Sequence, residues 1–499
     1  MELLPAERDV RIVTQRARFD ESTFGKHDSA ILVCQQERGE QLLSELPFAG
    51  LWRRLYREAS AHGPVSVLAA RVGPAGKPMV VAFGKKAASA FARLQLAARA
   101  WKELNAPPKA KVLLGTAGFE PGERARVLES LVAAALAATA PMPSSKSKPA
   151  PDATPAALTL LHEGAALDTS RPVAIDRGNH LARWLASLPP NVLNSAAYKR
   201  ALRTLARRHG WEFSFLDEAA LRRKGAGAFL AVSRANDHRE AGIVRIRYQG
   251  TGRGRKRVAL VGKGICFDTG GINLKPHKSM YQMHEDMQGS AVAVGTLLAL
   301  SELDAPFDVE CWLAITENQI GARAYRPQEI VRAANGMTIQ VVHSDAEGRM
   351  VLADTLALAA REDPDLILDF ATLTGACVNA LTERYSGIFT NRPEWHERLQ
   401  QAGRSSGERV WPFPMDEDYD TDLESPVADI MQCTLDSKGD HIIAARFLSR
   451  FVPERKPWIH IDLAASNRSG GLGHIPTDFT GFGVRYATHL LLDYDVLPK

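Results

Sequence analysis

The chain has 499 residues, which is more than one hydrophobic core normally holds, since single cores stop growing beyond about 250–300 residues. We therefore expect two domains. Hydrophobic residues make up 45% and charged residues 24% of the chain, and these globular shares exclude a chain that is disordered throughout. The net charge of +5, spread over a chain of this length, creates only a weak electrostatic field and argues against a nucleic-acid coat protein.

The five cysteines are far apart in the sequence, and no two of them form a CxxC pair. This spacing excludes a disulfide-stapled scaffold and a zinc module with cysteine ligands, and it suits a reducing cytosol. No stretch reaches the ~18 apolar residues that a membrane-spanning helix needs, and the first residues, MELLPAERDVRIVTQ, lack the apolar core of a signal peptide. We expect a soluble, cytoplasmic protein without membrane contacts.

One segment departs from the composition of the rest. Residues 141–156 read PMPSSKSKPAPDATPA and include five prolines. Such a segment cannot bury enough apolar surface to order itself, so it is predicted to be a linker or a mobile loop. We expect an N-terminal α/β domain at 1–140 and a larger C-terminal α/β domain at 157–499.

Before the linker, apolar strand-like runs alternate with helical stretches. This alternation predicts an α/β domain with a largely parallel sheet. No motif here carries chemistry, so we interpret the domain as a scaffold or assembly unit. In chain order we expect strands at 30–34, 65–70 and 79–82, a helix at 87–104, a strand at 112–116 and a helix at 124–138.

After the linker, the pattern predicts a central mixed, mostly parallel sheet flanked by helices. Pro327 and Gly336 fit the first position and the end of a further helix. In such sheets ligands bind beyond the carboxyl ends of the strands, so the loops after strands are where chemistry is expected. We expect helices at 176–186, 196–209, 290–303, 327–336 and 350–361, and strands at 258–261, 309–315, 338–342 and 366–370.

Three predicted loops concentrate charged residues and glycines. They read GKGICFDTGGINLKP at 262–276, MHEDMQGS at 283–290 and HSDAEGR at 343–349. The Gly-Lys-Gly start of the first loop suggests phosphate binding. However, the GxxxxGK[ST] pattern is absent, and the lysine lies inside the turn rather than at a helix start, so we do not expect a phosphate loop.

Four acids in these loops could instead hold metal ions. They carry four negative charges, which two divalent cations would neutralise, whereas without cations neighbouring carboxylates repel each other and take up protons. Oxygen ligands without cysteine suit Mn²⁺, Mg²⁺ or Zn²⁺. The alternative is that they are solvated loop acids with helix-capping roles. The acids are Asp268, Asp286, Asp345 and Glu347.

Three basic residues accompany the acids. Lys263, beside two cations, would be driven toward its neutral form and could act as a ligand. Lys275 and Arg349 would stay charged. A neutral metal cluster with two positive side chains beside it would stabilise a developing anion, as in hydrolysis through a tetrahedral oxyanion.

The same loops resemble the leucyl aminopeptidase family, also called the cytosol aminopeptidases. The first loop is similar to the family signature VGKGITFDSGGISLKP, and HSDAEGRM resembles NTDAEGRL. The resemblance covers roughly residues 175–490. Further matching segments are SLPPNVLN at 187–194, DMQG at 286–289, ADTLALA at 353–359, ATLTGAC at 371–377, VADI at 427–430, AARFLSRFV at 444–452 and GFGVR at 481–485.

The resemblance implies a two-metal exopeptidase with a small N-terminal and a larger catalytic α/β domain. Lys263, Asp268, Asp286 and Glu347 would hold one cation, and Asp268, Asp345 and Glu347 the other, so that Asp268 and Glu347 bridge. The cations would be Mn²⁺ or Zn²⁺, with Mg²⁺ or Co²⁺ as alternatives. A water between them would attack the scissile carbonyl.

The resemblance also implies the roles of the remaining site residues. Lys275 would bind substrate and stabilise the gem-diolate, and Arg349 would hold a bicarbonate-like anion that moves the proton to the leaving amine. Thr372 and Leu373 would give backbone contacts to the substrate. The implied protein is a cytoplasmic homohexamer that releases leucine or other apolar residues from the N-terminus of peptides, in peptide turnover.

The chain departs from the family pattern at several positions. His343 stands where asparagine is usual, and we interpret it as a loop residue that adjusts hydrogen bonds rather than as a ligand. Gln288 is bulkier than expected. Asp440 and His441 replace small residues and would alter specificity if their loop borders the substrate pocket.

Two alternative functions stay open. One is nucleic-acid binding, through the basic clusters at 203–208, 222–224 and 253–257. No aromatic residues interleave with these clusters, and solvated charged faces explain them better. The other alternative is a catalytically inactive relative kept as a structural hexamer. Against it, every expected metal and catalytic position is filled.

Overall fold

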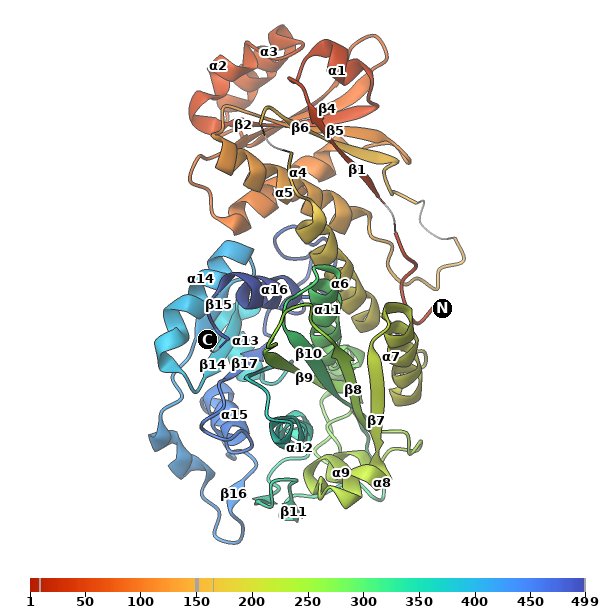
Figure 1. The fold of residues 1–499 in the computed structure, drawn as a ribbon, viewed down its shortest axis with the longest axis vertical. Coiled ribbons are helices and arrows are strands. Elements are labelled where there is room, and N and C mark those ends of the chain that lie inside the picture. Colours follow the sequence, from red (N-terminus) through yellow and green to blue (C-terminus); the bar gives the residue numbers. More distant parts are fainter. Residues whose placement is uncertain (9, 149–151, 165, 498–499) are drawn as a thin grey trace.

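The computed structural model of the chain describes residues 1–8, 10–148, 152–164 and 166–497. It consists of two α/β parts that follow one another along the long axis of the molecule (Figure 1). The N-terminal part is built on a six-stranded sheet and the C-terminal part on an eight-stranded one. The architecture confirms the predicted fold class, a smaller and a larger α/β domain.

The N-terminal sheet has the strand order β1-β6-β5-β2-β4-β3, and all neighbours are parallel except β3 and β4. Its elements are β1 (Arg11–Arg16), α1 (Glu21–Gly25), β2 (Ser29–Gln35), α2 (Gly39–Leu43), α3 (Ala49–Ser60), β3 (Val67–Val72), β4 (Lys77–Gly84), α4 (Ala90–Leu104), β5 (Lys111–Ala117), α5 (Pro121–Thr139) and β6 (Ala157–His162).

Helices cover both faces of this sheet, which explains its apolar strands. β2 reads SAILVCQ and is buried at every position, as expected for a parallel strand with a helix layer on each side. Its alternate residues separate into two cores. Ile31 and Val33 pack with α4 and α5, whereas Ala30 and Leu32 pack with α1, α2 and α3.

The last strand of this sheet corrects the predicted domain boundary. β6, at Ala157–His162, was expected to begin the C-terminal domain, but it pairs in parallel with β1 and β5. Its residues Leu158 and Leu160 complete the core beneath α5. The N-terminal sheet therefore needs a strand from beyond the proline-rich segment. Of that predicted linker, 141–148 and 152–156 contain no helix or strand, and 149–151 lie outside the described residues.

The C-terminal sheet has the order β15-β14-β17-β13-β9-β10-β8-β7. Its central strands β17, β13, β9 and β10 are parallel, whereas β8, β7 and the β14–β17 pair are antiparallel. The strands of this part are β7 (Glu212–Asp217), β8 (Gly242–Tyr248), β9 (Arg257–Asp268), β10 (Asp308–Asn318), β11 (Ile330–Arg332), β12 (Thr338–Gln340), β13 (Leu366–Ala371), β14 (Ser386–Thr390), β15 (Val410–Pro412), β16 (Ile430–Met431) and β17 (Trp458–Asp462).

Two helix layers sandwich this sheet. One layer, with α6, α7, α11, α14 and α16, shares a core with Leu260 of β9, and the other, with α9, α12 and α15, packs on Val261 of the same strand. The helices are α6 (Ser170–Ala186), α7 (Ser195–His209), α8 (Glu218–Arg223), α9 (Gly227–Ser233), α10 (His277–Met280), α11 (Gln288–Glu302), α12 (Glu347–Arg361), α13 (Gly375–Leu381), α14 (His396–Ser406), α15 (Asp440–Ser449) and α16 (Val484–Asp493).

The predicted helix from Pro327 to Gly336 is wrong. This segment contains β11, whose Ile330 and Arg332 pair with the antiparallel strand β12. Gly336 has a φ of +97° and serves the turn between the two strands rather than a helix end. The remaining predicted strands and helices overlap observed ones.

Helix α11 crosses α6 at very short range. A Cβ atom on Gly178 of α6 would lie 2.2 Å from the carbonyl oxygen of Gly295 in α11, and one on Gly295 would lie 2.5 Å from the oxygen of Gly178. Both positions therefore need glycine, because any side chain would push the helices apart. This contact fixes α11, whose N-terminal end lies at the site described below.

Polar contacts connect the two parts around α6. Arg8 forms an ion pair with Asp176 at 2.6 Å and donates to the carbonyl oxygen of Leu136 at the end of α5. The Nε2 atom of His180 donates to the carbonyl oxygen of Pro141 at 2.7 Å. His180 is 4% exposed, so this bond fixes the start of the proline-rich segment against α6. No helix among the described residues combines the length and the hydropathy that crossing a bilayer requires.

We predict that His180 makes the fold acid-sensitive. Burial, with smaller contributions from Arg183 and Arg8, lowers the pKa of His180 to about 3, so the unfolded chain takes up a proton below about pH 6.5 that the folded chain does not. Its contribution to stability is complete above pH 6.5 and decreases toward pH 3. Between pH 7.5 and 5.0 the loss amounts to about 2 kcal/mol.

The test is urea unfolding of wild type and His180→Gln at both pH values. Glutamine does not titrate and keeps a donor for the Pro141 carbonyl. The variant should therefore lose less stability on acidification than wild type by about that amount. Equal losses in both proteins would show that His180 is not responsible.

Candidate functional site

The residues singled out in the three loops meet at the carboxyl edge of the C-terminal sheet. They border one cavity of about 790 Å³, at the ends of β9 and β13 and at the N-terminal ends of α11 and α12. This is the position where open α/β sheets bind ligands. The cavity is bordered by Lys263, Asp268, Lys275, Asp286, Asp345, Glu347, Arg349, Thr372 and Leu373.

The first half of the first predicted loop is in fact strand. β9 continues to Asp268, so Lys263 lies within the sheet, five positions before Asp268. In a regular strand two such side chains would face opposite sides. The pairing with β10 shifts between Thr316 and Asn318, which gives β9 one extra residue. This bulge brings both side chains to the same cavity.

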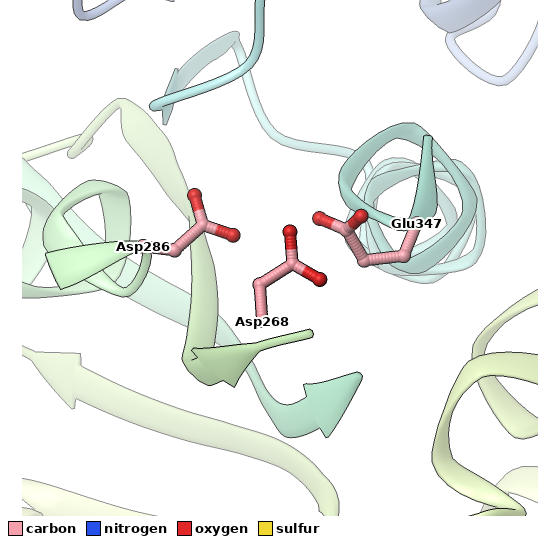
Figure 2. A group of neighbouring side chains, drawn as sticks. All are labelled: Asp268, Asp286 and Glu347. Atoms are coloured by element: carbon pink, nitrogen blue, oxygen red, sulfur yellow. The ribbon is translucent and has the colours of Figure 1, made fainter. Parts of the chain in front are cut away.

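Three carboxylates form the centre of the site (Figure 2). Oxygen atoms of Asp268, Asp286 and Glu347 lie within 4.8 Å of one another, and all three residues are at most 5% exposed. Asp268 ends β9, Asp286 precedes α11 and Glu347 begins α12. Three separate elements thus converge on one point.

Two lysines balance this charge. The Nζ atom of Lys263 lies 2.7 Å from Asp286 and 3.1 Å from Glu347. That of Lys275 lies 2.8 Å from Asp268 and 2.6 Å from Asp345. Each lysine therefore joins two carboxylates, and the four predicted acids share one network.

Burial dominates the ionisation of this network. It raises the pKa of Asp286 to about 6 and the pKa values of Asp345 and Glu347 to about 7, and the charge of Asp268 adds to the shift in all three. Burial alone would lower the pKa of Lys263, but the surrounding acids outweigh it and hold that pKa above its usual value. Lys263 is thus an ion-pair partner here, and a neutral ligand role requires cations nearby.

The donor set fits divalent cations. Carboxylate oxygens are the ligands that hard cations prefer. The Oδ2 atom of Asp286 is buried without a hydrogen-bond partner among the described residues, although Oδ1 of the same group accepts from Lys263 and Thr372. A buried carboxylate oxygen without a hydrogen-bond partner calls for an explanation, and coordination of a cation would satisfy it.

Glycines allow the elements to approach this closely. A Cβ on Gly262 would lie 2.4 Å from Cα of Ser290, and one on Gly289 would lie 2.1 Å from the carbonyl oxygen of Phe370, so α11 sits directly on β9 and β13. A Cβ on Gly348 would lie 2.6 Å from Cε of Lys263. Gly348 therefore provides the space through which the lysine reaches the acids.

The sequence interpretation missed several supporting residues. The Nδ2 atom of Asn318 donates to Asp268 at 2.8 Å and to the Ser344 carbonyl at 3.0 Å. The side-chain oxygen of Gln432 accepts the N–H groups of Val342 and His343 and so holds the third loop, at 343–349. Asn318 could have been found, because it follows a predicted strand at the sheet edge. Gln432 carried no such signal.

His343 behaves as predicted for a loop residue. Its Nδ1 atom accepts the backbone N–H of Asp345 at 3.3 Å, and burial lowers its pKa. Gln288 is buried and its side-chain amide lies between Glu285 and Ser466. Thr372 contributes more than expected, because its carbonyl oxygen accepts from Lys263 and its hydroxyl donates to Asp286.

Arg349 differs from the expectation of a bicarbonate-binding residue. Its Nη2 atom donates to both carboxylate oxygens of Asp440 at 2.8 Å, and its Nη1 atom to the Gln432 carbonyl at 3.3 Å. A carboxylate of the chain itself therefore bonds to the guanidinium group that the resemblance assigned to a dissolved anion. Asp440 borders the cavity, so the departure noted at this position does lie at the site.

Comparisons with known proteins agree with this geometry. A sequence model of the cytosol aminopeptidase family, catalytic domain, matches residues 180–488. A probable cytosol aminopeptidase of Parasynechococcus marenigrum (strain WH8102) is 37% identical over 94% of this chain and 98% of its own length. One from Stutzerimonas stutzeri (strain A1501) is 44% identical, but the match spans only 64% of either chain.

Solved structures extend the similarity to both parts of the fold. A mutant of tomato leucine aminopeptidase has a TM-score of 0.83 at 25% identity and covers 98% of both chains. The bottromycin maturation enzyme BotP, solved in complex with Mn, has a TM-score of 0.79 at 28% identity over 93% of this chain and 98% of its own. With the family model matching well over half of its length, this chain belongs to the cytosol aminopeptidase family.

Proposed function

We propose that this chain is a metal-dependent aminopeptidase that releases the N-terminal residue of peptides. The observation that carries the proposal is the buried carboxylate cluster with its two lysines at the edge of the sheet, in a cavity of about 790 Å³. Such a site can hold cations, water and a peptide end together. Membership of the family supports the same reaction.

Two divalent cations would be held by the residues of the network. Lys263, Asp268, Asp286 and Glu347 are the proposed ligands of one cation, and Asp268, Asp345 and Glu347 those of the other. The BotP complex with Mn supports Mn²⁺, and Zn²⁺, Mg²⁺ or Co²⁺ suit the same oxygen-rich donors. When bound, such cations lower the pKa of a water and polarise a carbonyl group.

The protein's own residues would position the substrate and stabilise charge. Lys275 keeps a positive charge at the cavity wall, where it would stabilise the oxygen of a tetrahedral intermediate. The Thr372 carbonyl already accepts a hydrogen bond from Lys263, and the Leu373 N–H already donates one to Asp462. Substrate contacts would therefore fall to the remaining backbone groups of this loop.

A preference for leucine or other apolar N-terminal residues is proposed from the cavity wall. Several apolar side chains face the cavity beside the charged cluster and could take up an apolar side chain of the substrate. They are Met283, Leu373, Val378, Leu463 and Ala464. A homohexameric assembly, a cytoplasmic location and a role in peptide turnover belong to the same proposal. Light scattering on the purified protein tests the hexamer.

Nucleic-acid binding has less support than peptide hydrolysis. In the basic cluster at 253–257, Arg255 pairs with Asp308 at 2.7 Å and Arg257 donates to the Glu362 carbonyl at 2.8 Å. These side chains are thus engaged within the protein. A gel shift with duplex DNA at low salt tests what remains of this alternative.

We predict metal-dependent release of p-nitroaniline from leucine p-nitroanilide. Chelation should abolish the activity and added Mn²⁺ should restore it. Asp268→Asn should reduce kcat by at least about 100-fold, because it removes a shared ligand. N-acetylated substrate, which lacks the free amine, should not be cleaved. Full activity of Asp268→Asn after chelation would contradict the two-metal proposal.

We also predict that Gly348→Ala weakens metal binding without unfolding the protein. The new methyl group displaces the end of Lys263, so the Mn²⁺ affinity measured by calorimetry should fall by about 10- to 100-fold. Gly50→Ala is the matched control, since Gly50 is also the second residue of a helix and a Cβ there meets nothing within 4 Å. Equal Mn²⁺ affinities of the two variants would show that the position of Lys263 does not matter for metal binding.

A further inference from the structure

Arg349 and Asp440 form a buried ion pair in the wall of the cavity. Arg349 lies in the first turn of α12, two residues after Glu347, and is 2% exposed. Asp440 is the first residue of α15. The side chain of Asp440 keeps 21% of its surface exposed, and both residues border the cavity that contains the carboxylate cluster.

The charges of the cavity separate into two groups. Lys263 and Lys275 bond to the four clustered acids, whereas Arg349 bonds to Asp440 alone among the carboxylates of the described residues. The guanidinium charge is thus compensated by a group that takes no part in the cluster. A second anion on Arg349 would lie beside a like charge, which is unfavourable.

An ion pair that only joins α12 to α15 would not need its carboxylate at the cavity surface. Holding a charged pair away from water is expensive, and neutral groups of similar size often stabilise as well. The exposed part of Asp440 therefore calls for a role toward the contents of the cavity. Asp440 lies in neither the metal cluster nor its lysine network, so it is available as an acid–base group.

We propose that Asp440, oriented by Arg349, is the proton-transfer group of the peptidase reaction, in place of a dissolved anion. The proposal rests on the proposed function. The Asp440 carboxylate accepts a proton from the attacking water while the water oxygen bonds to the scissile carbonyl carbon. It then returns this proton to the amide nitrogen, which keeps the electron pair of the breaking C–N bond and leaves as an amine.

The experiment compares wild type with Asp440→Gly and Asp440→Asn, loaded with metal, in carbonate-free buffer with and without sodium formate or bicarbonate. Wild type should be unaffected by either anion. Asp440→Gly should lose about 100-fold or more in kcat, the usual size of a general acid–base contribution. Added formate or bicarbonate should raise the kcat of Asp440→Gly at least about tenfold. Asp440→Asn should stay inactive, because its amide fills the anion position.

Anion binding gives a readout that does not depend on turnover. Calorimetry on the Zn²⁺-loaded proteins should show formate binding to Asp440→Gly but not to wild type or to the double variant Asp440→Gly/Arg349→Met. Asp420→Asn is the matched control. It breaks the ion pair of 2.5 Å that joins Asp420, of the segment Glu417–Leu423, to Arg446 of α15 outside the cavity, and should leave kcat unchanged.

The outcomes separate the proposals. Saturable stimulation of wild type by bicarbonate, or wild-type rates in Asp440→Gly, would overturn the role of Asp440. Loss of activity in Asp440→Gly without rescue or formate binding would assign the ion pair a purely structural role and overturn it too. Absence of peptide cleavage by wild type with every metal would instead refute the proposed function, and with it the inference.

Discussion

The structure of the site depends on one electrostatic constraint, the crowding of four carboxylates, three of them buried, in one small volume. Neighbouring buried acids repel each other and lose hydration, which is why burial raises the pKa values of Asp286, Asp345 and Glu347. Positive charge must therefore accompany them. Lys263 and Lys275 supply it here at distances of 2.6–3.1 Å, and divalent cations would supply more.

The surrounding fold can be understood as the means of holding this charge cluster together. The bulge in β9 turns Lys263 and Asp268 to the same side. Gly262 and Gly289 let α11 lie directly on the sheet, so that Asp286 reaches the cluster from the helix end. The α6–α11 crossing at Gly178 then locks that helix from behind. A larger side chain at any of these glycines would move an acid of the site.

The sequence predicted most of the strands and helices and the acids and lysines of the carboxylate network, because both leave local patterns. Apolar runs such as SAILVCQ mark strands covered on two faces. Patterns failed where distant partners decide the structure. β6 is a strand because β1 and β5 flank it, and the segment from Pro327 to Gly336 is a hairpin because β12 pairs with β11.

The same limit applies to the pair of Arg349 and Asp440. The sequence showed both charges and the unusual acid. It did not show that the two side chains, 91 positions apart in the chain, lie 2.8 Å from each other. That distance changes the role expected of Arg349. An open guanidinium would attract whichever anion the solution offers, whereas a compensated one presents a carboxylate at a fixed place. A covalently attached group does not have to bind before each turnover, and this removes the entropic cost that a dissolved anion would meet. The departure at Asp440 is thus best explained as a change in where the proton-transfer group comes from.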